Sequence, residues 1–121
     1  MVQYADPIRL DASFAALSDA TRRGVLEQLA RAEASITDLA ARFQMTLTGM
    51  KKHIGVLERA GLVSTEKIGR VRTCRLGAQG LTEEMGWIAD YHQRWHTRFN
   101  ALDTILEELK AKENMDGPDR Q

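Results

Sequence analysis

The sequence predicts a mainly α fold of the winged helix-turn-helix class, with a long C-terminal dimerisation helix. Three observations support this prediction. An amphipathic stretch that begins near Leu47 is followed at once by the pattern of a short β-hairpin. Basic residues gather on these two segments, although the whole chain carries 17 acidic and 17 basic residues and no net charge. A long apolar repeat then fills much of the remaining sequence.

The chain has 121 residues, enough for one compact domain with its own core. We expect an N-terminal arm over residues 1–9 and a domain over 10–112, which includes the C-terminal helix 81–112. Residues 113–121 are expected to form a flexible tail. The sequence has no apolar run of membrane-spanning length and no signal sequence, which favours a cytoplasmic protein without membrane contact.

A first short helix is predicted from Leu10 to Leu17. Leu10, Phe14 and Leu17 recur at spacings of four and three residues, so they share one face of that helix. We expect this face to be buried in the core.

A second helix is predicted from Ala20 to about Ala32, with Asp19 as its N-cap. Its apolar side consists of Val25, Leu26, Leu29 and Ala30. Arg22 and Arg23 lie in its first turn, where a cation opposes the helix dipole. Each is expected either to pair with a neighbouring carboxylate or to contact a DNA phosphate.

The helix-turn-helix itself follows. Ser35-Ile36 is predicted to form a short strand that pairs with the hairpin, and Thr37 is predicted to cap a third helix over 38–43. That helix would bury Leu39, Ala40 and Phe43. Gln44-Met45 is then the tight turn into the recognition helix.

The recognition helix is predicted to begin near Leu47, with Thr46 as its N-cap and Gly61 just beyond its end. Its core-facing side would consist of Leu47, Met50, Ile54 and Leu57. The opposite side is small, polar and basic, with Thr48, Gly49, Lys52, Gly55 and Arg59, flanked by Lys51 and His53. Small residues permit a close approach and the cations favour an anionic partner.

Residues 62–68 and 71–76 are rich in β-branched residues and are separated by Gly69-Arg70, which suits a two-residue type II′ turn. Between Arg42 and Arg75 there are eight basic residues and two acidic ones. This segregation of charge favours double-stranded DNA as the partner, with the helix in the major groove and the wing on the backbone. The expected contacts are Thr46, Thr48, Gly49, Lys51, Lys52, His53, Lys67, Arg70 and Arg72. For His53, packing at the foot of the helix is an equal alternative.

The C-terminal helix carries a heptad seam, formed by Met85, Ile88, His92, Trp95, Phe99, Leu102, Leu106 and Leu109. Trp87, Tyr91 and Ile105 add a second apolar edge. A seam of this size exceeds what a small domain needs for its own core. We therefore expect a partner helix from a second copy of the chain.

The segments FAALSDATRRGVLEQLA and ITDLAARFQMTLTGMKKHIGVLERAGLVSTEKIGRVRTCRL, over residues 14–30 and 36–76, resemble the ArsR-type family of bacterial winged-helix repressors. The stretch HIGVLERAGLV followed by a Gly-Arg wing is specific for the family. The resemblance implies a homodimer, paired through the first and last helices, that binds a palindromic operator. The residues expected at this interface are Phe14, Ile88, Trp95, Phe99, Leu102, Leu106 and Leu109.

The resemblance does not extend to the family's metal sites. Founding members bind metals through cysteines in the third helix or through Asp and His residues on the last helix. Here the third helix has no cysteine, and Asp90 and His92 match only the start of the second pattern, because Asp103 and Leu106 stand at its later positions. His92 and His96 lie one turn apart, but packing and solvation explain them better than chelation. We expect no metal and no cofactor, and the small-molecule effector is unknown.

The sequence also bears on functions other than repression. The sequence lacks a phosphate-binding glycine loop, a cysteine pair and a nucleophile elbow, so we expect no catalytic residues and no enzyme. Cys74 is the single cysteine, and we expect it to be a small apolar filler in the wing. Trp87 and Trp95 could line an effector pocket, although core or interface packing is commoner. A metal- or thiol-responsive repressor and a winged-helix docking module that does not bind DNA remain the alternatives.

Overall fold

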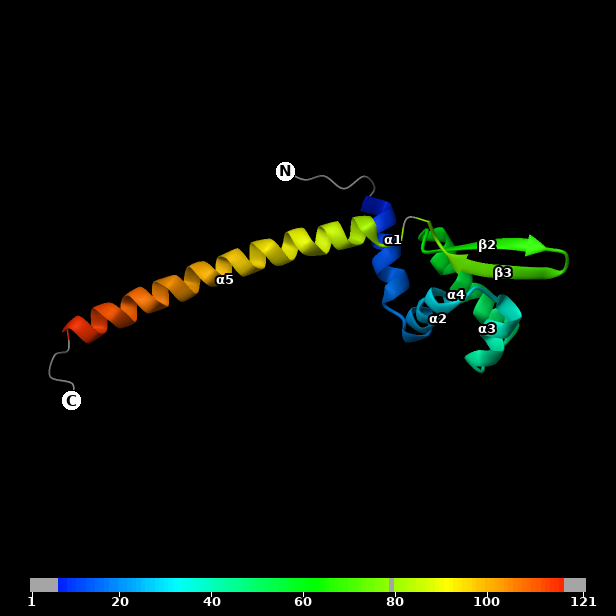
Figure 1. Ribbon diagram of the computed structural model, residues 1–121, viewed down its shortest axis with the longest axis horizontal. Helices are drawn as coiled ribbons and strands as arrows, with labels where there is room; N and C mark the ends of the chain where they lie inside the picture. The colour runs from blue at the N-terminus through cyan, green and yellow to red at the C-terminus, as the bar shows by residue number, and fades with distance from the viewer. Residues whose placement is uncertain (1–6, 79, 117–121) are drawn as a thin grey trace. The chain divides into compact units, whose positions relative to one another are not determined.

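The computed structural model describes residues 7–78 and 80–116, with side chains up to residue 114. These residues form five helices and a three-stranded sheet (Figure 1). The elements are α1 (Pro7–Leu17), α2 (Ala20–Arg31), β1 (Ala34–Ser35), α3 (Ile36–Arg42), α4 (Leu47–Arg59), β2 (Val63–Ile68), β3 (Val71–Leu76) and α5 (Thr82–Asp116). No helix in the described ranges is both long enough and apolar enough to span a membrane. The mainly helical winged helix-turn-helix fold is confirmed.

The chain divides into two units, Met1–Met85 and Gly86–Gln121. The first unit contains the elements from α1 to β3 and the first turn of α5. The second unit contains the remainder of α5, a single helix.

The core of the first unit lies between α2, α3, α4 and the sheet. Its most deeply buried large side chains include Val25, Leu39, Met50, Ile54 and Leu57. They come from three helices, and their spacing within each helix places them on one face. The predicted core is confirmed for these residues, whereas Ala30 on α2 is exposed because only a narrow stripe of that helix is covered.

The sheet has the strand order β1-β3-β2, and both pairings are antiparallel. Val63 pairs with Leu76 and Ile68 with Val71, which makes β2 and β3 the hairpin of the wing. The short strand β1 pairs Ala34 with Cys74. It lies one residue earlier than predicted, because Ser35 already caps the following helix.

Helix α1 differs from its prediction at its start and in its buried face. It begins at Pro7 rather than Leu10, since proline is well suited to the first helical position. Leu10 is buried as predicted, but Ser13 and Ala16 are buried with it, while Phe14 and Leu17 are only half-buried. The small residues allow α1 to approach α2 and α4, with which it is in contact. Residues 1–6 of the predicted arm lie outside the described residues.

Helix α3 starts at Ile36, so Thr37 is not its N-cap. The hydroxyl of Ser35 accepts a hydrogen bond from the N–H of Asp38 at 3.0 Å. Ser35 has the extended backbone of a strand end, with φ of −75° and ψ of 158°, and this is the conformation that an N-cap requires. Two neighbouring hydroxyl residues could serve as the cap, and strand pairing decides between them.

Helix α5 extends to Asp116, beyond the predicted end at Lys112. Part of the predicted tail, 113–116, is therefore helical, and 117–121 lie outside the described residues. Between Gly86 and the pair Gly117 and Pro118, the sequence contains no glycine or proline, the residues that most disfavour a helix. Their position explains the longer helix.

Candidate nucleic-acid interface

The turn between α3 and α4 is closed by two backbone hydrogen bonds. The N–H of Gln44 donates to the carbonyl of Ala41 at 3.2 Å, and the N–H of Met45 donates to that of Ala40 at 2.9 Å. These bonds form a Schellman motif. Gln44 takes its left-handed position with φ of 54°, which costs a non-glycine residue about 1–2 kcal/mol. The packing of α3 on α4 therefore holds this turn in a defined geometry.

Thr46 is the N-cap of α4, as predicted. Its Oγ1 accepts a hydrogen bond from the N–H of Gly49 at 3.0 Å. A Cβ atom on Gly49 would lie 3.1 Å from the same oxygen. Any side chain at that position would crowd the cap, so glycine keeps the first turn of α4 narrow.

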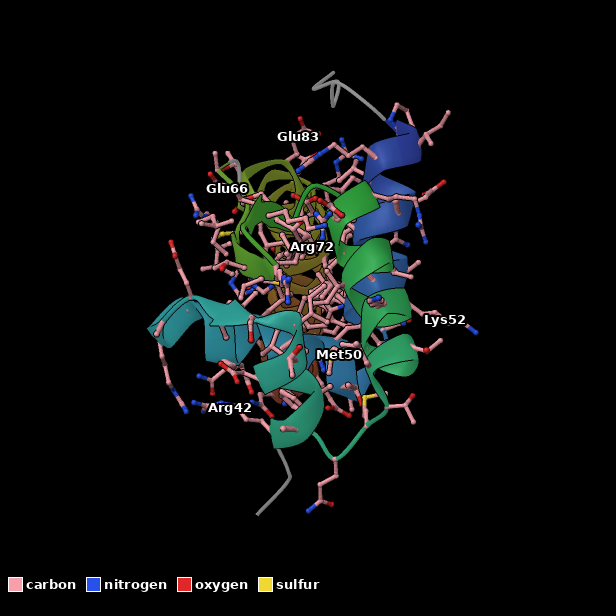
Figure 2. The ribbon with its side chains drawn as sticks, turned by 90° about the vertical axis from the view of Figure 1, so that its right-hand side faces the viewer. Arg42, Met50, Lys52, Glu66, Arg72 and Glu83 are labelled. Atoms are coloured by element: carbon pink, nitrogen blue, oxygen red, sulfur yellow. The ribbon has the colours of Figure 1, made fainter. Side chains whose placement is uncertain are left out.

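The body of α4 separates a buried face from an exposed basic face. Met50, Ile54 and Leu57 are buried, whereas Thr48, Lys51 and Lys52 are exposed. Figure 2 shows Met50 turned toward the interior and Lys52 projecting away from α4. In the part of the chain that the structure describes, Lys51 and Lys52 make no hydrogen bond or ion pair. Both ammonium groups remain available for an external anion.

Leu47 is the exception to the predicted core face. Its side chain is 42% exposed, although it continues the row of Met50 and Ile54. The prediction was wrong because Leu47 is the first residue of the helix, where α4 projects past the core. Instead of packing inward, Leu47 lines an open groove between the start of α3, the start of α4 and the wing.

The end of α4 is joined closely to the wing. Gly61 has φ of 78°, and the N–H of Leu62 donates to the carbonyl of Leu57 at 2.9 Å, which completes a second Schellman motif. The N–H of Gly77 then donates to the carbonyl of Leu62 at 2.9 Å. A Cβ atom on Gly77 would collide with the backbone oxygen of Gly61. Glycine at position 77 therefore permits the end of β3 to lie directly on the end of α4.

The wing displays two free cations and one that is tied to α4. Gly69 has φ of 64°, as the predicted type II′ turn requires at its first central position. Lys67 and Arg70 beside it are exposed and, among the described residues, make no hydrogen bond or ion pair. Arg72 donates to Thr65 Oγ1 at 2.9 Å, and Thr65 donates to Glu58 Oε2 at 2.8 Å. Arg72 thus links the wing to the recognition helix.

The other wing arginine is neutralised within the protein. Arg75 lies 3.1 Å from Glu66 and 3.4 Å from Glu33, measured between guanidinium nitrogens and carboxylate oxygens. It was not among the predicted DNA contacts. Its two carboxylate partners distinguish it from Lys67 and Arg70.

An open groove of about 590 Å³ lies between the start of α3, the start of α4 and the wing. Its lining residues are Ser35, Ile36, Thr37, Asp38, Leu47, Lys51, Lys67, Arg70, Val71 and Arg72. Four of them are cations and one is an acid. The groove therefore brings together cations from the helix and the wing, including four of the residues predicted to contact DNA.

His53 belongs to a polar cluster with Asp19 and Arg22, at the start of α2. Its Nδ1 lies 3.3 Å from Nη1 of Arg22 and 3.9 Å from Oδ2 of Asp19. Asp19 caps α2, and the backbone N–H of Arg22 holds the pKa of that carboxyl below its ordinary range, with help from the charge of Arg22. The imidazole is mostly covered, so this contact supports the packing role for His53 over a direct contact with DNA.

Arg22 and Arg23 have partners within the protein that the sequence analysis did not predict. Arg22 donates to the carbonyls of Ala15 and Ala16 at 3.0 Å and 2.8 Å, and Arg23 donates to the carbonyl of Leu17 at 2.7 Å. These carbonyls lie in the last turn of α1, where cations are favourable. The two arginines stabilise the corner between α1 and α2.

Cys74 lies in the middle strand of the sheet and is fully buried. Burial raises the pKa of its thiol to about 11, and the charge of Glu58 acts in the same direction while that of Arg72 opposes it. Because the thiolate is the reactive form, this thiol is inert while the sheet is intact. The packing role expected from the sequence agrees with its position.

In the second unit, the predicted seam of α5 is exposed along its length. Trp95, Phe99 and Leu102 are 47%, 45% and 43% exposed, and Ile88, Leu106 and Leu109 are exposed as well. The rings of Trp95 and Phe99 are in contact, with centroids 4.3 Å apart. Beyond Glu84, none of the described side chains of α5 is buried. Phe14, the remaining residue predicted at the dimer interface, is half-buried on α1.

The potential metal ligands on α5 are sparse. The rings of His92 and His96 stack with centroids 5.8 Å apart, and His92 also stacks on Trp95. Asp90 pairs with Arg94 at 3.1 Å. Within residues 7–78 and 80–116, no group of three or more His, Cys, Asp or Glu side chains is arranged to hold a metal ion.

Comparison with known proteins places these features in a family. A helix-turn-helix domain family matches residues 17–66. The HTH-type transcriptional regulator YuzN of Bacillus subtilis, itself uncharacterised, is 36% identical over 86 residues, which cover 64% of this chain and 94% of that protein. The crystal structure of an ArsR family transcriptional regulator is 42% identical, covers 79% of this chain and 97% of that chain, and superposes with a TM-score of 0.71. This chain belongs to the ArsR family.

As an ArsR-family member, the protein is a DNA-binding helix-turn-helix transcriptional regulator and not an enzyme. The transcriptional repressor SdpR of Bacillus subtilis is also similar, with 26% identity over 78 residues, 64% of this chain and 87% of that protein. The assignment favours DNA binding over the docking-module alternative. It confirms the resemblance to the ArsR family.

Sequence reasoning missed two features of the interface. The exposure of Leu47 could have been suspected from its place at the first helical position, where neighbours are fewest. The link from Arg72 through Thr65 to Glu58 joins residues seven apart in the sequence. Only the register of the hairpin against α4 brings these three side chains together, and no local pattern predicts that register.

Proposed function

We propose that this protein is a transcriptional repressor that binds a palindromic operator as a homodimer. The observation that carries the proposal is that exposed cations from two elements line one groove. Lys51 comes from α4, and Lys67 and Arg70 come from the wing. Lys52 adds a fourth unpaired cation on the outer side of α4. Phosphate contacts from such side chains position a recognition helix in the major groove.

Two further observations support the homodimer and the repressor role. The exposed seam of α5 has the heptad spacing of a helix that pairs with another helix. Two copies related by a two-fold axis would present two DNA-contacting surfaces, each formed by α4 and the wing, and this symmetry matches a palindromic site. SdpR, a similar protein, is described as a repressor. Deleting the gene should therefore raise transcription next to the bound sites, and a fall would indicate an activator.

The test of the DNA contacts starts with fragments selected by the purified full-length chain. On the selected operator, Lys52→Ala and Arg70→Ala should each weaken binding. If the lost contact is to phosphate, the slope of log affinity against log salt should flatten by about 0.9 per contact, or roughly 1.8 for both subunits of a dimer. Affinity is measured by titration of labelled duplex at several salt concentrations.

Arg75→Ala is the matched control, because Arg75 lies in the same wing but is paired with Glu33 and Glu66. It should leave the salt slope unchanged. Unaltered binding by both Lys52→Ala and Arg70→Ala would remove these residues from the interface. A wild-type protein without any salt-sensitive binding to duplex DNA would overturn the proposed function and favour a protein-docking role.

A further inference from the structure

Leu47 is the apolar side chain that α4 contributes to a groove with four cations, which also contains the apolar side chains of Ile36 and Val71. It occupies the first position of α4, is 42% exposed and lines the groove that also contains Lys51 and Arg70. The fold does not use it as a core residue, because the buried row of α4 starts one turn later at Met50. Leu47 is not among the buried residues of the core.

The position of Leu47 suits contact with a base edge. In helix-turn-helix proteins the N-terminal residues of the recognition helix are the ones that reach the bases. Lys51 lies one turn further along the helix and is free to bind phosphate or a base acceptor.

The chemistry of leucine then restricts what can be recognised. Its isobutyl group has no hydrogen-bond donor or acceptor, so it cannot distinguish bases by polar groups. In the major groove only thymine presents an apolar group, the C5 methyl. We propose that Leu47 contacts a thymine methyl group in each half-site and is a specificity-determining residue of this regulator.

This assignment rests on the proposed function, since it needs an operator in contact with α4. The wing supplies a matched control. Val71 is also apolar, half exposed and part of the same groove, but it lies on β3 rather than on α4. A residue of the wing borders the DNA backbone and not the base edges, so Val71 should not respond to a change in a methyl group.

The experiment uses the full-length protein and an operator obtained by selection from random duplex DNA. Each thymine is replaced in turn by uracil in both half-sites, which removes only the C5 methyl. At one thymine per half-site, wild-type binding should weaken by about fourfold per half-site, or ~15-fold for the two together, as expected for loss of one buried methyl group. Leu47→Ala should bind the thymine and uracil operators equally, whereas Val71→Ala should keep the wild-type sensitivity.

A second variant tests specificity directly. Leu47→Gln replaces the apolar group by an amide, which pairs with adenine in the major groove, so binding by this variant should no longer depend on the thymine methyl group. Circular dichroism verifies that each variant is folded, as expected for an exposed residue.

The outcomes separate the two proposals. Wild-type protein that binds every uracil operator as well as the thymine operator would overturn the Leu47 contact alone. The same conclusion would follow if Leu47→Ala retained the uracil sensitivity. Failure to select any duplex, with no salt-sensitive binding, would overturn the proposed function and the Leu47 contact with it.

Discussion

Helices α4 and α5 carry similar apolar rows but use them in opposite ways. In α4 the row from Met50 to Leu57 is completely buried by the protein's own α2, α3 and sheet. In α5 the row from Trp95 to Leu109 is exposed, and none of the described residues of its unit covers it. Apolar residues at helical spacing therefore predict that a face is buried, but not whether the same chain or a second chain buries it.

The energetic difference between the two rows is large. Covering one large apolar side chain contributes about 1.5–3 kcal/mol, and six predicted interface residues lie uncovered on α5. A second copy of the same helix would cover them at once on both chains. Mutations in the apolar row of α4 should therefore lower the stability of the fold, whereas mutations in the row of α5 should weaken association of two chains.

The largest effect is expected for Leu102→Asp in the middle of the α5 seam. A carboxylate at this place would have to be buried in the dimer, so the protein should become monomeric. Linked binding modules exceed single ones by about 10²–10⁴-fold, and operator affinity should fall by a factor in that range. Equilibrium sedimentation and operator titration measure the two effects.

Ala101→Asp is the control for that experiment, because Ala101 is also exposed on α5 but is not part of the seam. It should remain dimeric and bind DNA. A wild-type protein that is monomeric at micromolar concentration would remove the basis of the comparison.

A pair of Leu→Ala substitutions sharpens the comparison. Leu57→Ala on α4 should lower the free energy of unfolding by about 2–5 kcal/mol, since it opens a cavity in the core. The dimer dissociation constant of the folded protein should change little. Leu106→Ala on α5 should instead weaken the dimer by about 1–3 kcal/mol. Urea unfolding at one fixed protein concentration and sedimentation across a dilution series give the two quantities, and an exchange of the two phenotypes would refute the assignment.

The smallest effect is expected from metal ions. His92 and His96 lie among the aromatic residues of α5 and have no third ligand within the described residues. An effector acts only through a difference in its binding to two conformations, typically about 1–3 kcal/mol. A metal ion held by two histidines has an incomplete set of ligands, so its coupling should fall well below this range. Zinc, nickel or cobalt should therefore leave operator affinity unchanged, and His92→Ala should affect dimer stability instead. A tenfold loss of operator affinity with one metal, reversed by chelator and absent in His92→Ala, would establish a metal sensor.

The elements of the reading surface could be predicted because their determinants are local. Thr46 caps α4 and Gly61 ends it through contacts within a few residues, and Gly69 marks the turn of the wing. The failures have a different origin. Arg22 and Arg23 bind carbonyls at the end of α1, and a partner that is a backbone oxygen leaves no trace in the sequence. Leu47 obeys the apolar period but lies beyond the edge of the core, and periodicity contains no information about where a core stops.

Because Cys74 is buried in the middle strand, the rate at which a reagent modifies its thiol measures how often the sheet opens. At neutral pH a thiol with a pKa of about 11 is almost entirely protonated, and its side chain has no contact with solvent. A thiol reagent can modify it only after β3 separates from β1 or β2, its neighbours on either side. The rate of modification therefore counts these openings. Arg72 on β3 is linked through Thr65 on β2 to Glu58 on α4, so separation of β3 from β2 would also release the wing from the recognition helix.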